Sequence, residues 1–310
     1  MENRWSDKDA DSAIAAYGKQ GIAADIALRV YTTRLLGQVP ELVLHGGGNT
    51  SVKTKTTDLL GDEVEVLCVK GSGWDMGLIE PAGLPAVKLQ PLRKARKLER
   101  LSDEDMVNFQ RGNLIDAASP NPSVETLLHA FLPHKFVDHT HAAAVLSLTD
   151  QPDGMELAKE VYGERMGIVP YVMPGFELAK AAADIFDQDQ TVEGLILHKH
   201  GIFTFGGDAR EAYERMICMV SLAEGRLGKG RRQVFAAREL PKGLAKPSEI
   251  APIIRGACAR AGADGAGSAG ANEPRRLIAT FRSDAAILTY VNGTELSDYS
   301  QRGVVTPDHI

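Results

Sequence analysis

The sequence predicts an α/β protein, because short apolar runs with β-branched residues are interspersed with segments of helical periodicity. Its 310 residues allow about two domains, or one large domain with an extension, and can bury a substantial core. Two glycine-rich turns and two His-x-His pairs lie among the predicted elements.

Residues 22–36 predict an amphipathic helix, since Ile22 and Ile26 begin a stripe of apolar residues four apart. Residues 41–44 and 64–69 predict two strands, each followed by a turn that contains glycine. The first part of the chain is therefore expected to run from helix to strand.

Residues 121–123, Asn-Pro-Ser, predict the start of a helix that continues through TLLHAFL. A strand is expected from residue 136, and a second one over residues 191–205, interrupted at Gly201. Two further segments have helical periodicity, namely residues 177–186 and 209–227.

Gly and Ala dominate residues 256–274, which is the composition of a flexible linker. We expect this linker to separate a main domain, residues 1–255, from a C-terminal extension, residues 275–310. Within the extension, RRLIATFRS and AAILTYVNG predict two strands.

Composition excludes several classes of partner. The chain has 35 Lys+Arg against 41 Asp+Glu, a net charge of −6, which disfavours nucleic acid or an anionic membrane as partner.

Three cysteines without CxxC spacing indicate reduced thiols. The N-terminus lacks the apolar stretch of a signal peptide, and no run is long enough to span a membrane, so we expect a soluble cytoplasmic protein.

The two His-x-His pairs, His139 with His141 and His198 with His200, are the clearest chemical signal. Alternate residues of a strand point to one face, so two imidazoles at this spacing can reach one metal ion. A lone pair is more often packing, but two pairs together indicate a bound divalent metal. Three imidazoles and an open position suit catalytic Zn²⁺ or another borderline divalent ion.

The turns HGGGNTS and KGSG form the second signal. Glycine lets backbone N–H groups converge on phosphate oxygens, and Asn49 and Ser72 add neutral donors, with Lys70 as an electrostatic helper. The alternative is a pair of tight turns without a ligand. Neither GxxxxGK[ST] nor a full GxGxxG is present, which disfavours a nucleotide.

Glu125 is the third signal, at the predicted helix start. Alone, such a carboxylate is more often a partner of the helix dipole. Together with a metal that polarises a carbonyl and donors that hold a phosphate, it supplies carbon-acid chemistry through an enediolate. His129, four residues later, either orients Glu125 or packs in the core.

The segments GGGNTSVK, KGSGWDMG, PSVETLLHAFLPHKFVDHTHAAAV and LHKHGIFTFG, in this order, resemble the class II aldolase/adducin family. The likeness is greatest to the aldolase part of rhamnulose-1-phosphate aldolase/short-chain dehydrogenase fusion proteins. Residues 1–255 would then be the catalytic domain. Residues 275–310, ending in TPDHI, are similar to the junction that precedes the dehydrogenase.

The resemblance implies a role for each matching residue. It implies zinc ligation by His139, His141 and His200, and acid/base catalysis by Glu125. Phosphate contacts fall on Gly48, Asn49, Ser72, Gly73 and Ser123. Two positions depart from the pattern. Val124 replaces a second serine, and His198, if it lies on a strand with His200, would face substrate, support the ligands or serve as a fourth ligand. A proton-donating tyrosine would be Tyr162 or Tyr171.

The resemblance also implies a three-layer α/β/α sandwich around a mostly antiparallel sheet, assembled as a homotetramer. The implied function is a zinc-dependent lyase that cleaves a ketose 1-phosphate, with rhamnulose 1-phosphate as the first candidate, to dihydroxyacetone phosphate and an aldehyde. A sugar-phosphate dehydratase and a pentulose-phosphate epimerase share the fold. An adducin-like module without metal is the non-enzymatic alternative, and the three histidines argue against it.

Overall fold

The computed structural model describes residues 1–229, 243–259 and 277–309. It divides the chain into two compact units, residues 1–230 with 304–310, and residues 231–303. The first unit contains all the predicted site residues. No helix among the described residues is long and apolar enough to cross a membrane.

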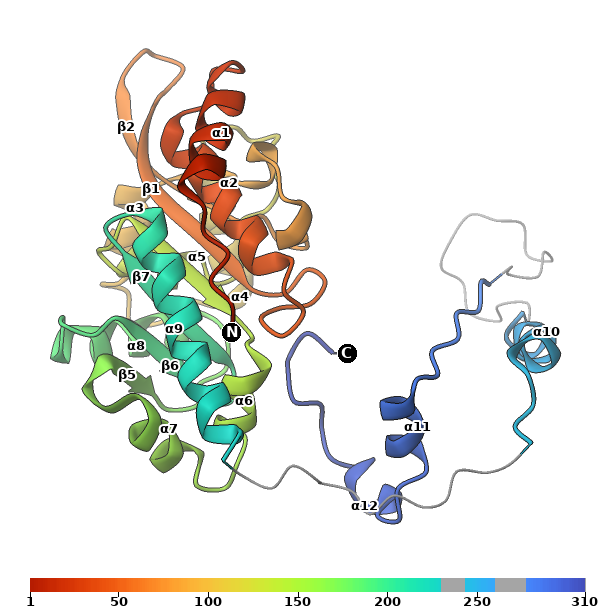
Figure 1. Ribbon diagram of the computed structural model, residues 1–310. Helices are drawn as coiled ribbons and strands as arrows, with labels where there is room; N and C mark the ends of the chain where they lie inside the picture. The colour runs from red at the N-terminus through yellow and green to blue at the C-terminus, as the bar shows by residue number, and fades with distance from the viewer. Residues whose placement is uncertain (230–242, 260–276, 310) are drawn as a thin grey trace. The chain divides into compact units, whose positions relative to one another are not determined.

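A seven-stranded sheet, counted over the described residues, forms the middle of the first unit, with strand order β3-β2-β1-β4-β7-β6-β5 (Figure 1). Every neighbouring pair is antiparallel except β5 with β6. The strands are β1 (Asn49–Thr57), β2 (Glu63–Val69), β3 (Ala86–Lys88), β4 (Phe136–Thr140), β5 (Met166–Val169), β6 (Gly194–Leu197) and β7 (Gly201–Gly206). The predicted mostly antiparallel sheet is confirmed.

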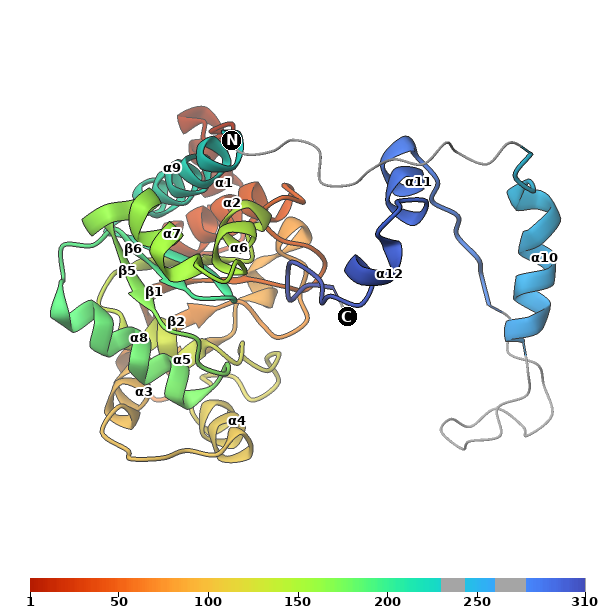
Figure 2. The ribbon, with the colours of Figure 1, turned by 90° about the horizontal axis from the view of Figure 1, so that it is seen from below.

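Helices cover both faces of this sheet, so the unit has three layers (Figure 2). One face carries α3 (Leu89–Ala95), α4 (Asp103–Gly112), α5 (Thr126–Phe131) and α8 (Phe176–Gln188). The other carries α1 (Asp7–Gly18), α2 (Ala24–Gly37), α6 (Ala143–Thr149), α7 (Gly154–Tyr162) and α9 (Ala209–Leu227). Short 3₁₀ turns connect them at η1 (Met76–Leu78), η2 (Pro81–Gly83) and η3 (Gly163–Arg165).

Several predicted elements are confirmed, and local chemistry explains where they begin. Apolar periodicity correctly predicted α2, α8 and α9. The N-cap of α9 is Asp208, whose carboxylate accepts a hydrogen bond from Glu211 N at 2.8 Å. Residues 64–69 lie in β2 as predicted, and the apolar half of that strand is buried between the two helical layers.

Two predicted strands are wrong in the first unit. Residues 41–44 form a turn, because local backbone hydrogen bonds such as Leu42 N to Val39 O at 2.9 Å close the chain on itself. The predicted strand over residues 191–205 is instead the antiparallel pair β6 and β7. The turn between them contains Lys199 in the left-handed region, with φ of 59°.

The second unit contains α10 (Pro247–Cys258), α11 (Ala285–Val291) and α12 (Leu296–Tyr299). The strand predicted from AAILTYVNG is wrong, since α11 occupies it. Asp284 caps this helix by accepting a hydrogen bond from Ile287 N at 2.8 Å, a local bond that favours helix over strand. Residues 277–283 of RRLIATFRS have no regular structure. Residues 260–274 of the predicted linker lie outside the described residues, and the predicted domain boundaries stay a prediction.

A buried ion pair connects the sheet to α2 beside the predicted metal ligands. Arg29 and Asp138 are both fully buried, with Nη2 and Oδ1 2.5 Å apart. Desolvation lowers the pKa of Arg29 and raises that of Asp138, and their mutual attraction opposes both effects. Arg29 Nη1 also donates to Ser51 O on β1 at 3.2 Å, so one side chain bridges α2, β1 and β4.

Candidate active site

Three histidines converge at one end of the central strands. His139 is the fourth residue of β4, His141 follows the end of that strand, and His200 lies in the turn before β7. One nitrogen of each ring lies within 4.8 Å of the other two. The two His-x-His pairs therefore contribute unequally, with both residues from the first and one from the second.

The outward hydrogen bonds of the rings define which nitrogens face one another. His139 Nδ1 donates to Ile202 O at 3.1 Å, and His141 Nδ1 donates to the Asp308 carboxylate at 2.7 Å. Both Nε2 atoms then carry lone pairs, and they lie 3.1 Å apart. Two lone pairs at this separation repel one another unless a proton or a metal ion lies between them.

Burial favours the neutral form of His139 and of His200. Desolvation lowers the pKa of His139 well below its usual value, and the charges of His141 and His200 lower it further. Desolvation also lowers the pKa of His200, against the opposing charge of Glu125. Neutral imidazole is the form that ligates a metal.

Glu125 completes the cluster from the residue that precedes α5. Its Oε2 lies 3.3 Å from His139 Nε2, and its Oε1 lies 3.4 Å from His200 Nε2. Oε1 is buried and has no hydrogen-bond partner among the described residues. Three imidazole nitrogens and an unsatisfied carboxylate oxygen form a donor set that fits Zn²⁺ or another borderline divalent ion.

The Glu125 carboxylate is held in place by a buried polar chain. Asn49 Nδ2 donates to Glu125 Oε2 at 2.6 Å and to Ser123 Oγ at 3.0 Å. Asn49 Oδ1 accepts from His129 Nε2, and His129 Nδ1 accepts from Ser51 Oγ at 2.8 Å. His129 thus acts on Glu125 through Asn49, an arrangement that its spacing of four from Glu125 did not reveal.

Lys70 joins the two glycine turns. Its ammonium group is buried and donates to Gly46 O at 2.9 Å, in the first turn, and to Trp74 O at 2.7 Å, after the second. Desolvation lowers the pKa of Lys70 to about 8. Gly48 has φ of +58°, and a Cβ there would lie 2.8 Å from His139 O, so this position requires glycine.

The two turns, Glu125 and two of the histidines share one pocket of about 300 Å³. Its lining consists of Gly46, Gly47, Gly48, Asn49, Lys70, Ser72, Gly73, Ser123, Val124, Glu125, His141, Pro174, His200 and Pro307. His139 lies fully buried beside it. Residues predicted from three separate motifs thus meet around one space.

Hydrogen-bond donors for an anion remain available in this pocket. Ser123 Oγ accepts from Asn49 Nδ2 and from Glu125 N at 3.3 Å, which leaves its own proton for a ligand. The backbone N–H groups of Gly48 and Gly73 have no acceptor among the described residues. Asn49 differs, because both protons of its amide already bind Ser123 and Glu125.

Three other residues considered for the site, His198, Tyr162 and Tyr171, belong neither to the histidine cluster nor to the lining of this pocket. His198 is in the β6–β7 turn, so the strand geometry expected to align it with His200 is wrong, and it is not part of the histidine cluster. The Tyr162 hydroxyl is buried in the core, where desolvation raises its pKa. Tyr171 is exposed, and its hydroxyl donates to Met173 Sδ at 3.0 Å.

Asp308 is the site residue that sequence reasoning missed. Its side chain is 2% exposed, and its carboxylate contacts His141. The TPDH segment was visible in the sequence, but its resemblance marked it only as a domain junction. A separation of 167 residues between Asp308 and His141 gave no local signal.

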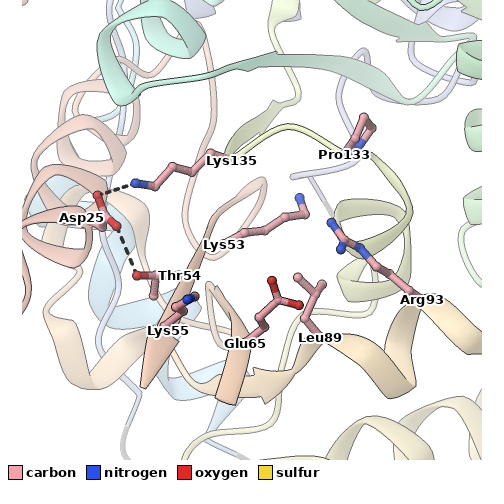
Figure 3. Close-up of a pocket in the computed structure, with 9 residues that line it drawn as sticks. All are labelled: Asp25, Lys53, Thr54, Lys55, Glu65, Leu89, Arg93, Pro133 and Lys135. Carbon is pink, nitrogen blue, oxygen red and sulfur yellow. Dashed lines mark hydrogen bonds and ion pairs between the residues drawn. The ribbon is translucent and has the colours of Figure 1, made fainter. Parts of the chain in front are cut away.

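A second pocket, of about 410 Å³, shares no lining residue with the first (Figure 3). Lys53, on β1, is buried at this pocket and donates to His129 O at 2.8 Å and His134 O at 2.7 Å. Burial lowers the pKa of Lys53 to about 7, and the nearby charge of Arg93 contributes. This pocket contains none of the metal-ligand candidates.

Comparison with known proteins agrees with this architecture. Residues 28–227 match the family model for the class II aldolase and adducin N-terminal domain, and residues 245–310 match the model for the aldolase class II second domain. The chain belongs to the class II aldolase and adducin family, which confirms the predicted family. This membership supports an enzyme of the lyase type.

The proteins similar to this chain include a solved domain and a longer relative. The solved N-terminal class II aldolase domain of a conserved protein from Thermoplasma acidophilum is 40% identical with a TM-score of 0.66, over 73% of this chain and 99% of that one. A Bacillus subtilis (strain 168) protein named uncharacterized oxidoreductase YuxG is 35% identical over 288 residues. That match covers 91% of this chain but 40% of the relative, so the chain spans well under half of the relative's length.

Lys53 provides a pH-dependent test of the second pocket. Its folded pKa of about 7 lies below that of an unfolded lysine, so the unfolded state binds more protons above pH 7. The free energy of unfolding of the wild type should therefore rise by about 2 kcal/mol from pH 7 to 9 relative to Lys53→Met. Urea unfolding at several pH values measures this, with exposed Lys55→Met as control; equal slopes for wild type and Lys53→Met would contradict it.

Proposed function

We propose that this protein is a zinc-dependent aldolase that cleaves a ketose 1-phosphate, with rhamnulose 1-phosphate as the first candidate, to dihydroxyacetone phosphate and an aldehyde. The observation that carries the proposal is the position of Glu125. Its Oε1, which has no hydrogen-bond partner within the described part of the chain, lies 3.4 Å from His200 Nε2, at the wall of a pocket that also presents anion donors. A homotetramer in the cytoplasm remains our prediction for assembly and location.

His139, His141 and His200 would hold the metal, which when bound supplies a Lewis acid that polarises the substrate carbonyl. Ser72, Gly73, Gly48 and Ser123 would bind the phosphate through hydroxyl and backbone N–H donors. Lys70 fixes the separation of the two turns that carry these donors. The family membership and the shared pocket support these assignments.

Glu125 would move the proton that cleavage requires. Cleavage breaks the bond between the carbon next to the carbonyl and the hydroxyl-bearing carbon beyond it. That hydroxyl gives up its proton, which Glu125 would accept, and its carbon becomes the aldehyde, while the electron pair of the broken bond stays on the dihydroxyacetone phosphate fragment. Protonation of the carbon that keeps the electron pair completes the product. Glu125 is suited to this step because Asn49 fixes one oxygen and leaves the other without a hydrogen bond.

Metal content tests the ligand set. We expect one divalent ion per chain in the wild type, and a large loss in His139→Ala and His200→Ala, because a three-imidazole site that loses one ligand binds weakly. Elemental analysis after dialysis against dilute chelator measures this. His198→Ala, from the same His-x-His pair as His200, is the matched control and should retain its metal. Full occupancy in the His139 and His200 variants would refute the ligand set.

Solvent deuterium exchange into dihydroxyacetone phosphate tests the role of Glu125. An aldolase should catalyse this exchange without any aldehyde present, and Glu125→Gln should lower its rate by about 10²–10⁴-fold while the metal remains bound. Exposed Glu164→Gln serves as control. Unchanged exchange in Glu125→Gln would show that this carboxylate is no acid/base group. Absent exchange in a wild type that eliminates water from a ketose phosphate would favour the dehydratase.

A further inference from the structure

The C-terminal segment of the first unit, residues 304–309, packs against the histidine cluster. Asp308 is nearly fully buried there, Oδ1 lies 2.7 Å from His141 Nδ1, and Oδ2 accepts a hydrogen bond from Leu44 N at 3.0 Å. Thr306 is also buried, and its hydroxyl bonds to His309 Nδ1 at 2.8 Å, which closes the turn that presents Asp308. Both carboxylate oxygens of Asp308 are thus used.

The first glycine turn is shaped around this carboxylate. A Cβ on Gly47 would lie 1.6 Å from Asp308 Oδ1, so any side chain at this position would displace the carboxylate or the turn. The same hypothetical Cβ would lie 3.1 Å from Leu44 O, which leaves it little room to move. Glycine at position 47 and aspartate at position 308 therefore fit one another, although 261 residues separate them.

His141 depends on such a partner more than His139 does. It lies just beyond the end of β4, whereas His139 is inside the strand and has its Nδ1 held by Ile202 O. A carboxylate that accepts from Nδ1–H fixes the ring orientation and the tautomer that leaves Nε2 unprotonated, and it makes Nε2 a stronger ligand. That Nε2 is the atom that lies 3.1 Å from His139 Nε2.

The balance of charge at the histidine cluster also favours a role for Asp308 in supporting a metal ion. Among the residues that the structure describes, Glu125 is the acidic side chain that contacts the imidazole cluster from the pocket side, and Asp308 adds a second negative charge behind His141. Two carboxylates match the charge of a divalent cation held by three imidazoles. Without a metal ion, hydrogen bonds from His141 and Leu44 N and the nearby charge of Lys70 offset the desolvation of this carboxylate.

We propose that Asp308 is a positioning residue of the metal site, which orients His141 and strengthens its bond to the ion. This inference rests on the proposed metal-dependent function. It means that the part of the chain matching the aldolase class II second domain, residues 245–310, contributes to the site through its last residues. Pro307 extends this contribution to the wall of the pocket.

Zinc affinity of Asp308→Asn tests the proposal without any substrate. Competition with a chromophoric chelator should show affinity about 10–100-fold weaker than in the wild type, the usual effect of losing a carboxylate behind a ligating histidine. Asp298→Asn is the matched control, because this aspartate has an exposed ion pair with Arg302 and its loss removes the same charge. Wild-type zinc affinity in Asp308→Asn would overturn the proposal.

Gly47→Ala gives a second, independent test, since the added methyl group should displace Asp308 while every charge is kept. Its zinc affinity should fall by a similar factor, and the double variant should lose little more than either single variant. If the losses of zinc affinity in the two single variants add up in the double variant, the two residues do not act through a shared mechanism and the proposal is contradicted. A wild type that binds zinc but cleaves no ketose phosphate would refute the proposed reaction and leave the role of Asp308 intact.

Discussion

The register of three adjacent strands is the constraint on which the site depends. β4 lies between β1 and β7, and its pairing places Asn49 opposite His139 on one side and Phe203 opposite His139 on the other. Residues paired in this way point to the same face, so the amide that holds Glu125, the central imidazole and the ring that stacks on it lie side by side. A slip of one residue in either pairing would turn His139 to the other face.

Burial then determines the chemistry of the groups that the register brings together. In a region of low dielectric constant, an imidazole is neutral unless an acid stabilises its charge, and each polar group needs a partner. A series of side-chain hydrogen bonds runs from Ser51 through His129 and Asn49 to Glu125. It satisfies Oε2 of the Glu125 carboxylate and leaves Oε1 without a partner among the described residues. The unsatisfied Oε1 and the facing lone pairs of His139 and His141 are complementary to a cation.

The sequence predicted the parts of this site that depend on local pattern. His139 and His141 lie at strand spacing, Glu125 lies at a helix start, and the second glycine turn follows β2, all as expected. The first glycine turn precedes β1 instead of following a strand, because residues 41–44 form a turn. His198 could not be placed correctly, because a left-handed Lys199 converts the apparent strand into a turn. Asp308 and His129 depend on contacts between distant segments, which neither propensity nor spacing encodes.

X-ray absorption spectroscopy at the zinc edge of the zinc-loaded protein tests the central claim most directly. A site of three imidazoles and oxygen predicts only light ligands at about 2.0–2.1 Å, with the multiple-scattering pattern of about three histidines. Sulfur at about 2.3 Å would contradict the account, because it would place the ion on cysteine rather than on the histidine cluster. A pattern of one histidine or none would contradict it equally.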